Sequence, residues 1–283
     1  SNSIIVRKKY IDKVIPFINT DLIKVLTGQR RVGKSYLLKT IIEHLKAQNK
    51  SANIIYVDKE LMDFDFITDF KTLIRYTESK INARKKNYLF IDEIQDIQQF
   101  EKALRHFVYG IYSAKRTVMD LALTKYKKLW MKIAPHYFKL VDALFANRKW
   151  PSGKYIAFGT IWGMYPRFLK DKTFQIPFWH HTPRYIPVVI AHELLHFIFY
   201  DYFYARYPKY RKTKDNLFAW HVSEIFNTII QNSPAWLDWF KLKSLGYPEH
   251  KKIVIHISRI LYRRNVWDLN ALVDKIIKDV QNQ

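Results

Sequence analysis

Cysteine is absent from this 283-residue chain, and glycine is scarce at seven residues. Without cysteine the protein contains no disulfide, and a bound metal would need histidine and carboxylate ligands. The absence also fits a reducing compartment, so we expect a cytoplasmic protein. The low glycine content argues against a glycine-rich sandwich or barrel and favours helices.

Long uncharged apolar runs are also absent. No stretch of 18 residues is both apolar and free of charge, and no signal peptide is recognisable, so the sequence predicts no transmembrane segment. The nearest approach, residues 186–200, is interrupted by two histidines and a glutamate. Because 48% of the residues are hydrophobic, we expect a globular protein with room for two domains.

Acidic side chains are comparatively few. The chain has 25 aspartates and glutamates but 48 lysines and arginines, which gives a formal net charge of +23. The first 109 residues hold 20 basic and 13 acidic side chains, and the remainder hold 28 and 12. Such a charge would attract nucleic acid, anionic lipid or acidic proteins. The basic residues are scattered, however, so a solvated basic surface is the simpler interpretation and nucleic acid an unspecific alternative partner.

The N-terminal part alternates between two patterns. Residues 22–27, 53–58 and 87–94 are apolar runs typical of buried strands, and 34–48 and 66–82 have helical periodicity. Strands that alternate with helices predict a parallel sheet covered on both faces.

After residue 107 the pattern changes. Residues 113–147 predict one or two long helices with a break at Pro135, and 154–165 and 172–179 are strand candidates. The rest predicts helices, over 184–205, 215–231, 234–245, 250–263 and 267–281. With a boundary near 108–112, we expect two domains, residues 3–109 and 110–283.

The segment "GQRRVGKS" fits the phosphate-loop pattern G-x-x-x-x-G-K-[ST] and lies between a predicted strand and helix. Backbone N–H groups of such a loop converge on phosphate oxygens at a helix N-terminus. Lys34 would reach the β- and γ-phosphates of ATP, and Ser35 would bind Mg²⁺. The expected nucleotide-binding residues here are Gly28, Arg31, Val32, Gly33, Lys34 and Ser35. The alternative is a structural turn.

Two acidic residues end the third predicted strand, in "YLFIDEI". Asp92 can hold Mg²⁺ through water, and Glu93 can polarise the attacking water. The alternative is a strand that ends in solvated acids.

"TGQRRVGKSYLLK" together with "YLFIDEIQ" resembles the AAA-type P-loop ATPases of prokaryotes whose C-terminal half is nuclease-like. The resemblance covers roughly residues 4–107 and implies ATP binding. In that family further strands carry a polar sensor residue and an arginine that completes the site. After "FEKALRHF" the sequence contains no such pattern, so we expect a partial sheet and nucleotide binding, with hydrolysis in doubt.

"HELLH" places two histidines four residues apart in a predicted helix, where both imidazoles lie on one face over a common ion. Catalytic zinc takes three protein ligands and a water. Glu224 lies inside the next apolar helix, where a carboxylate costs free energy unless it has a partner such as zinc. Just upstream, 172–179 is a candidate edge strand for an extended peptide. The alternative is a core helix with two hydrogen-bonded histidines.

This layout resembles the gluzincin group of zinc metallopeptidases over about residues 150–231. The resemblance implies that His192, His196 and Glu224 bind Zn²⁺, and that Glu193 is the general base that activates the zinc-bound water. His221 is an alternative third ligand or a group that stabilises the oxyanion.

We therefore expect an α/β P-loop NTPase-like module with a partial parallel sheet, followed by a mainly α (α+β) zincin-like domain. The expected function is a zinc-dependent peptidase, acting on peptides or unfolded polypeptide, with an ATP-binding module of regulatory, coupling or vestigial role. One alternative is an ATP-binding protein with a structural metal, associated with nucleic acid. Another is a fusion of two halves that do not cooperate.

Overall fold

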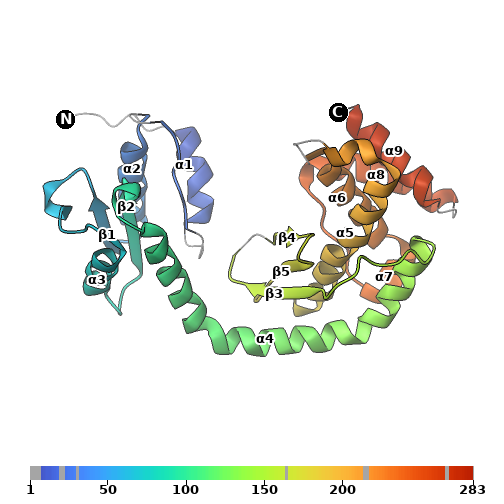
Figure 1. Ribbon diagram of the computed structural model, residues 1–283, viewed down its shortest axis with the longest axis horizontal. Helices are drawn as coiled ribbons and strands as arrows, with labels where there is room; N and C mark the ends of the chain where they lie inside the picture. Colours follow the sequence, from blue (N-terminus) through green and yellow to red (C-terminus); the bar gives the residue numbers. More distant parts are fainter. Residues whose placement is uncertain are drawn as a thin grey trace. The chain divides into compact units, whose positions relative to one another are not determined.

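The computed structural model describes residues 8–18, 23–29, 32–162, 165–212, 217–264 and 268–282. Contacts within the chain divide it into two compact units, with the division between Arg116 and Thr117. This division lies inside the helix α4 (Phe100–Leu144), which belongs to both units (Figure 1). We describe each unit by itself.

The first unit is a small α/β structure. Its helices and strands are α1 (Lys8–Val14), α2 (Lys34–Gln48), β1 (Asn53–Asp58), α3 (Phe70–Lys80), β2 (Asn87–Asp92) and the start of α4, with short 3₁₀ turns at Ile15–Phe17, Met62–Phe64 and Ile94–Asp96. Strands β1 and β2 pair in parallel, in a register that places Asp58 opposite Asp92. A small parallel sheet with helices was predicted, and the structure confirms it.

The predicted strand at 22–27 is wrong for the residues that the structure describes. Residues 23–29 form no strand, and the side chain of Val25 is 70% exposed. A strand needs a hydrogen-bonded neighbour. Among the described residues the sheet of this unit comprises β1 and β2, and the apolar run before the phosphate loop pairs with neither.

The described residues of the second unit form the rest of α4, three short strands and five further helices. These are β3 (Ile156–Thr160), β4 (Arg167–Phe168), β5 (Thr173–Pro177), α5 (Ile186–Arg206), α6 (Leu217–Gln231), α7 (Pro234–Phe240), α8 (Lys251–Arg264) and α9 (Leu269–Gln281), with 3₁₀ turns at Pro183–Tyr185, Pro208–Lys212 and Pro248–His250. The remainder is thus mainly helical, as predicted.

The predicted break at Pro135 is also wrong, because α4 continues through this residue. A proline inside a helix removes one backbone hydrogen bond and costs about 3 kcal/mol. Buried side chains lie on both sides of it, with Ala134 at 8% exposure and Tyr137 and Val141 at 0%. We attribute the continuity to this packing, which holds the helix on either side of the proline.

The three strands form a sheet in the order β3-β5-β4. Strand β3 runs parallel to β5, and β4 runs antiparallel to it. Strand β5, within the segment 172–179, is therefore central, and the prediction that this segment forms the edge is wrong. The edges of the sheet are β3 and β4.

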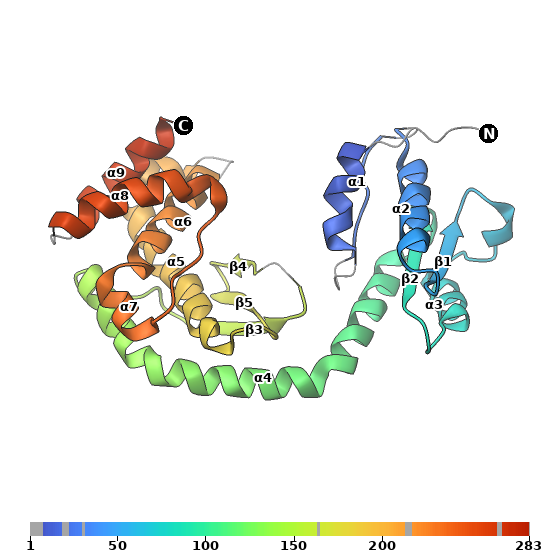
Figure 2. The ribbon, with the colours of Figure 1, turned by 180° about the vertical axis from the view of Figure 1, so that it is seen from behind.

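Helix α5 forms the core of the second unit. It contacts β5 and α6, while α8 and α9 pack against α6 (Figures 1 and 2). By length and composition alone the described segment Pro183–Arg206 could cross a membrane, but 83% of its most apolar window is buried by the rest of the protein. A helix that is apolar on all sides and covered by neighbouring elements is typical of a protein core.

Candidate metal centre and nucleotide site

The buried helix α5 carries the histidine pair and the glutamate between them. His196 is fully buried, Glu193 is 6% exposed, and His192 is half-buried. The Nε2 atoms of His192 and His196 lie 3.1 Å apart, because residues four apart share a helix face. Both imidazoles therefore point at one volume.

Glu224 reaches the same volume from α6, which packs along α5. Its Oε2 lies 3.0 Å from His192 Nε2, and its Oε1 lies 3.3 Å from His196 Nε2. One ligand atom from each of the three residues lies within 4.8 Å of the other two. The structure thus brings together the three residues that the sequence predicted as ligands.

The spacing of these atoms suits a small metal ion. Ligand atoms 2.0–2.1 Å from a tetrahedral zinc ion are about 3.3 Å from one another. The two histidine nitrogens, 3.1 Å apart, and Oε2 of Glu224, 3.0 Å from His192 Nε2, have spacings close to this value; the oxygen 3.3 Å from His196 Nε2 is the other one, Oε1. Imidazole nitrogen and carboxylate oxygen are also ligands that zinc accepts, so the donor set fits the ion.

Gln231, two turns after Glu224 on α6, orients His192. Its Nε2 donates to the backbone oxygen of Val188, so its Oε1 accepts from His192 Nδ1 at 2.8 Å. An imidazole whose Nδ1 donates in this way, when neutral, has an unprotonated Nε2 that is free to bind a metal. Asn227, between Glu224 and Gln231, donates to the backbone oxygen of His192. The sequence analysis missed both residues.

Burial and charge set the protonation of the group. Burial lowers the pKa of His196 well below its usual value, and the Arg167 cation lowers it further. Burial raises the pKa of Glu224, but its contacts with His196 and His192 outweigh this and hold the pKa far below its usual value. Burial lowers the pKa of His192, but its contacts with Glu224 outweigh this and raise the pKa. A neutral imidazole and an ionised carboxylate are the forms that bind metal ions, so a bound ion would displace the proton of His192.

The sequence analysis also missed Arg167, the first residue of β4. Its Nη1 donates to Glu193 Oε2 at 2.9 Å, and its Nη2 donates to Glu224 Oε1 at 2.7 Å. Burial raises the pKa of Glu193, and the Arg167 charge opposes that rise. Nothing in the sequence around Arg167 relates it to Glu193, 26 residues further along the chain.

The alternative ligand His221 lies elsewhere. Its Nδ1 is 2.7 Å from Nε2 of His250, a residue that is 1% exposed. His221 does not belong to the group of potential ligands among the described residues. The geometry therefore favours Glu224 over His221 as the third ligand.

The phosphate loop precedes α2. Gly33 adopts the left-handed conformation, with φ 90°, at the start of the helix, and Gly28 has φ 156°. The ammonium group of Lys34 donates to the backbone oxygens of Gly28 and Gln29, both at 3.1 Å. The side chain of Lys34 thus joins the start of α2 to the backbone of residues 28 and 29. Val32 is exposed and Ser35 half-buried at this end, and Arg31 lies outside the described residues.

Asp92 and Glu93 lie at the carboxyl end of β2. Asp92 is 4% exposed, and its carboxylate accepts from the backbone N–H of Glu93 and from the Tyr56 hydroxyl. The same hydroxyl donates to Asp58, and burial with these two carboxylates raises the pKa of Tyr56. Glu93 has a left-handed backbone, with φ 52°, which is uncommon for a residue other than glycine.

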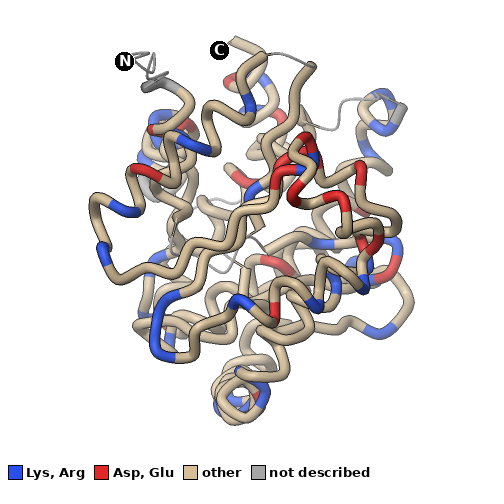
Figure 3. The backbone as a smooth tube through the Cα atoms, turned by 90° about the vertical axis from the view of Figure 1, so that its left-hand side faces the viewer, with Lys and Arg blue, Asp and Glu red and all other residues tan. Residues whose placement is uncertain are grey.

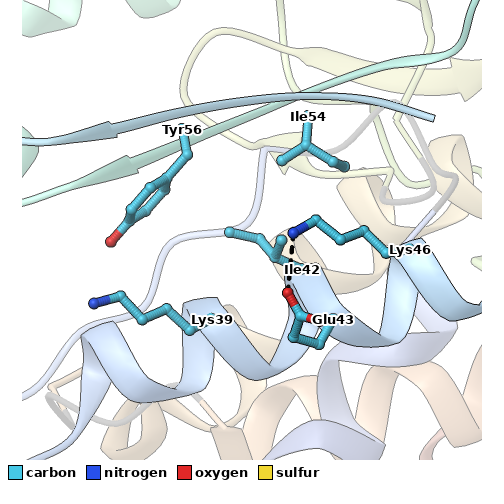
Figure 4. A pocket seen from close by; sticks show the side chains of 6 residues that line it. All are labelled: Lys39, Ile42, Glu43, Lys46, Ile54 and Tyr56. Carbon is cyan, nitrogen blue, oxygen red and sulfur yellow. Dashed lines mark hydrogen bonds and ion pairs between the residues drawn. The ribbon is translucent and has the colours of Figure 1, made fainter.

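A shallow pocket of about 380 Å³ lies between α2 and β1. Figure 4 shows that side chains of α2, among them Lys39 and Lys46, face Ile54 and Tyr56 of β1. None of the residues that line it belongs to the phosphate loop. We assign no ligand to this pocket.

The basic residues form runs of at most three along the sequence, such as residues 84–86. Figure 3 shows lysine and arginine interspersed with acidic and uncharged residues in the part of the chain that the structure describes. This distribution gives no specific support to a nucleic-acid partner.

Comparison with known proteins identifies the N-terminal part. Residues 20–120 match the family model described as an AAA domain. A protein of Haemophilus influenzae, described as an uncharacterized protein, is 35% identical over 104 residues, which are 36% of this chain and 26% of that protein. The chain thus spans about a quarter of the length of this curated relative. No solved structure matches the chain.

The N-terminal part is therefore AAA-type and P-loop ATPase-like, and this points to nucleotide binding. The matched segment ends at residue 120. It therefore includes none of the candidate metal ligands His192, His196 and Glu224.

Proposed function

We propose that the protein is a zinc-dependent peptidase that also carries an ATP-binding module of regulatory, coupling or vestigial role. The observation that carries the proposal is the convergence of His192, His196 and Glu224 beside the buried Glu193. Three protein ligands are typical of catalytic zinc, whereas structural zinc sites have four. We place the protein in the cytoplasm, on the grounds that it lacks cysteine.

In this proposal the three ligands hold Zn²⁺, which supplies a Lewis acid and lowers the pKa of a coordinated water. Glu193 accepts a proton from the attacking water and passes it to the leaving amine. Its raised pKa brings the carboxyl closer to the operating pH, where a general base is most effective. Arg167 occupies Oε2 of Glu193, so Oε1 is the oxygen left for this proton transfer.

The substrate that we propose is an extended peptide or unfolded polypeptide. Strand β4 is an edge of its sheet, and Arg167 on this strand contacts Glu193 and Glu224. A peptide that adds to this edge by backbone hydrogen bonds would pass beside the metal group. This replaces the central segment 172–179 as the docking strand.

The N-terminal module would bind ATP with Mg²⁺ through Gly28, Arg31, Val32, Gly33, Lys34 and Ser35, with Asp92 and Glu93 at the end of β2. The AAA match and the left-handed Gly33 at the start of α2 support nucleotide binding. Residues 23–29 form no strand and β2 has β1 as its paired neighbour, so we limit the proposal to binding and leave hydrolysis out of it.

Lys34→Ala should weaken ATP binding about 10-fold or more, because a hydrogen bond to a charged group contributes about 1.5–3 kcal/mol. Titration with a fluorescent ATP analogue in the presence of Mg²⁺ measures the dissociation constant. Lys39→Ala removes an exposed lysine from the same helix and should leave binding unchanged. Equal weakening by both variants would indicate general attraction of the basic surface rather than a phosphate loop.

The second candidate is an ATP-binding protein with a structural metal, associated with nucleic acid. The net charge of +23 is the observation that favours it. It predicts that removal of the metal destabilises the fold and that Glu193 takes part in no reaction. A third alternative, two fused halves that do not cooperate, predicts that ATP leaves peptidase activity unchanged.

A further inference from the structure

Arg167 links the two carboxylates of the candidate metal centre. It belongs to β4, Glu193 to α5 and Glu224 to α6, so three elements meet at one guanidinium group. The side chains are 14%, 8% and 4% exposed, respectively. The two hydrogen bonds of 2.9 and 2.7 Å come from different terminal nitrogens.

The contact with Arg167 engages one oxygen of each carboxylate. On Glu193, Oε2 accepts from Arg167. On Glu224, Oε1 accepts from Arg167 at 2.7 Å and lies 3.3 Å from His196 Nε2, while Oε2 lies 3.0 Å from His192 Nε2. A buried guanidinium holds its partners in a fixed planar geometry and stays charged. Its positive charge at Oε1 competes directly with a metal ion for the lone pairs of that oxygen.

We propose that Arg167 is a positioning residue that confines Glu224 to metal binding through the single oxygen Oε2. The inference rests on the proposed metal centre and goes beyond it. It states that Arg167, which itself binds no metal, determines how many oxygens of Glu224 bind the ion. With Oε1 engaged, the protein supplies two nitrogens and one oxygen, and a coordination position is left for water. The same side chain holds Oε2 of Glu193, which leaves Oε1 as the proton acceptor.

Without Arg167, Oε1 of Glu224 becomes free to bind the ion together with Oε2. Carboxylates bind metal ions through either one or two oxygens. A second oxygen raises the coordination number. The role of Arg167 is therefore visible in the spectrum of the bound metal, independently of any activity.

Cobalt(II) provides the test, since four-coordinate cobalt absorbs visible light more strongly than five- or six-coordinate cobalt. We would load the unchanged protein, Arg167→Gln and Arg148→Gln with cobalt(II) and record their visible spectra. Arg148 forms an ion pair with Asp201 of α5, at 2.8 Å, so its variant also removes an arginine ion pair to this helix. We expect Arg167→Gln to lower the molar absorption about two-fold or more, and Arg148→Gln to leave it unchanged.

A spectrum of folded Arg167→Gln that coincides with that of the unchanged protein would overturn the inference. Loss of cobalt binding in this variant, with unchanged circular dichroism, would also overturn it, because Arg167 would then create the site rather than limit its coordination. If Arg167→Gln does not fold, the same spectrum is recorded for Arg167→Lys. We expect its molar absorption to lie between that of the unchanged protein and a two-fold reduction, and an unchanged absorption would contradict the inference. Failure of the unchanged protein to bind cobalt or zinc would instead overturn the metal centre itself.

Discussion

Glu224→Gln should reduce bound zinc from about one ion per chain to a small fraction of that value. Zinc sites with four ligands bind with about 10–16 kcal/mol, so one ligand accounts for about 3 kcal/mol, or about 100-fold in affinity. Glutamine keeps the size of the side chain and an oxygen that accepts from Arg167, but it loses the negative charge. Elemental mass spectrometry on protein purified without added metal, and again after zinc is supplied, measures the content.

The control for this variant is Asp238→Asn, which removes an exposed carboxylate from α7 in the same unit. It should retain zinc like the unchanged protein. Thermal unfolding of both variants separates a lost ligand from a lost fold. Zinc retained at full affinity in Glu224→Gln would remove this residue from the ligand set. If none of the proteins binds zinc, α5 is a core helix with two hydrogen-bonded histidines, and the phosphate loop is the remaining candidate functional site.

Local patterns predicted several helices and strands of the first unit. Residues 34–48 and 53–58 coincide with α2 and β1, since helical spacing and an unbroken apolar run are read within one element. The run at 22–27 has the same character, yet its described part forms no strand. Whether such a run becomes a strand depends on a neighbour elsewhere in the chain, and no local pattern contains that information.

The residues around the candidate metal centre also differ in how far the sequence predicts them. The two histidines and Glu193 lie within five residues, and Glu224 stands out as a carboxylate inside an apolar helix, so sequence alone gathered them. Gln231 was also within reach of the sequence, because Glu224, Asn227 and Gln231 follow one another at spacings of three and four residues. A polar stripe along an otherwise apolar helix indicates a common buried partner.

Arg167 could not be predicted from such local patterns. It lies in a strand of two residues, and its contacts with α5 and α6 depend on the pairing of β4 with β5. That pairing also made β5 the central strand, which reversed the predicted edge. Arg167 thus reaches the site through the order of the strands, which no local pattern in the sequence contains.

Glu193→Gln should abolish peptide hydrolysis while zinc content stays unchanged. A positioned general base contributes about 10²–10⁴-fold, so we expect kcat to fall about 1,000-fold on any peptide that the unchanged protein cleaves. Glutamine can still accept from Arg167 through its amide oxygen, so the packing between β4 and α5 is retained, but the amide cannot take a proton from water. A peptide library analysed by mass spectrometry identifies the cleaved substrate, and its kinetics give kcat and KM separately.

Asp201→Asn makes the same change of carboxylate to amide on α5, outside the metal group, and should leave kcat unchanged. Hydrolysis that persists in Glu193→Gln would point to another base or to a contaminating peptidase. If the unchanged protein binds zinc but cleaves no peptide, and both variants unfold like it, the metal is structural. The buried contact between Arg167 and Glu193 would then be an ion pair that serves the fold, and the ATP-binding protein with a structural metal would be the better description.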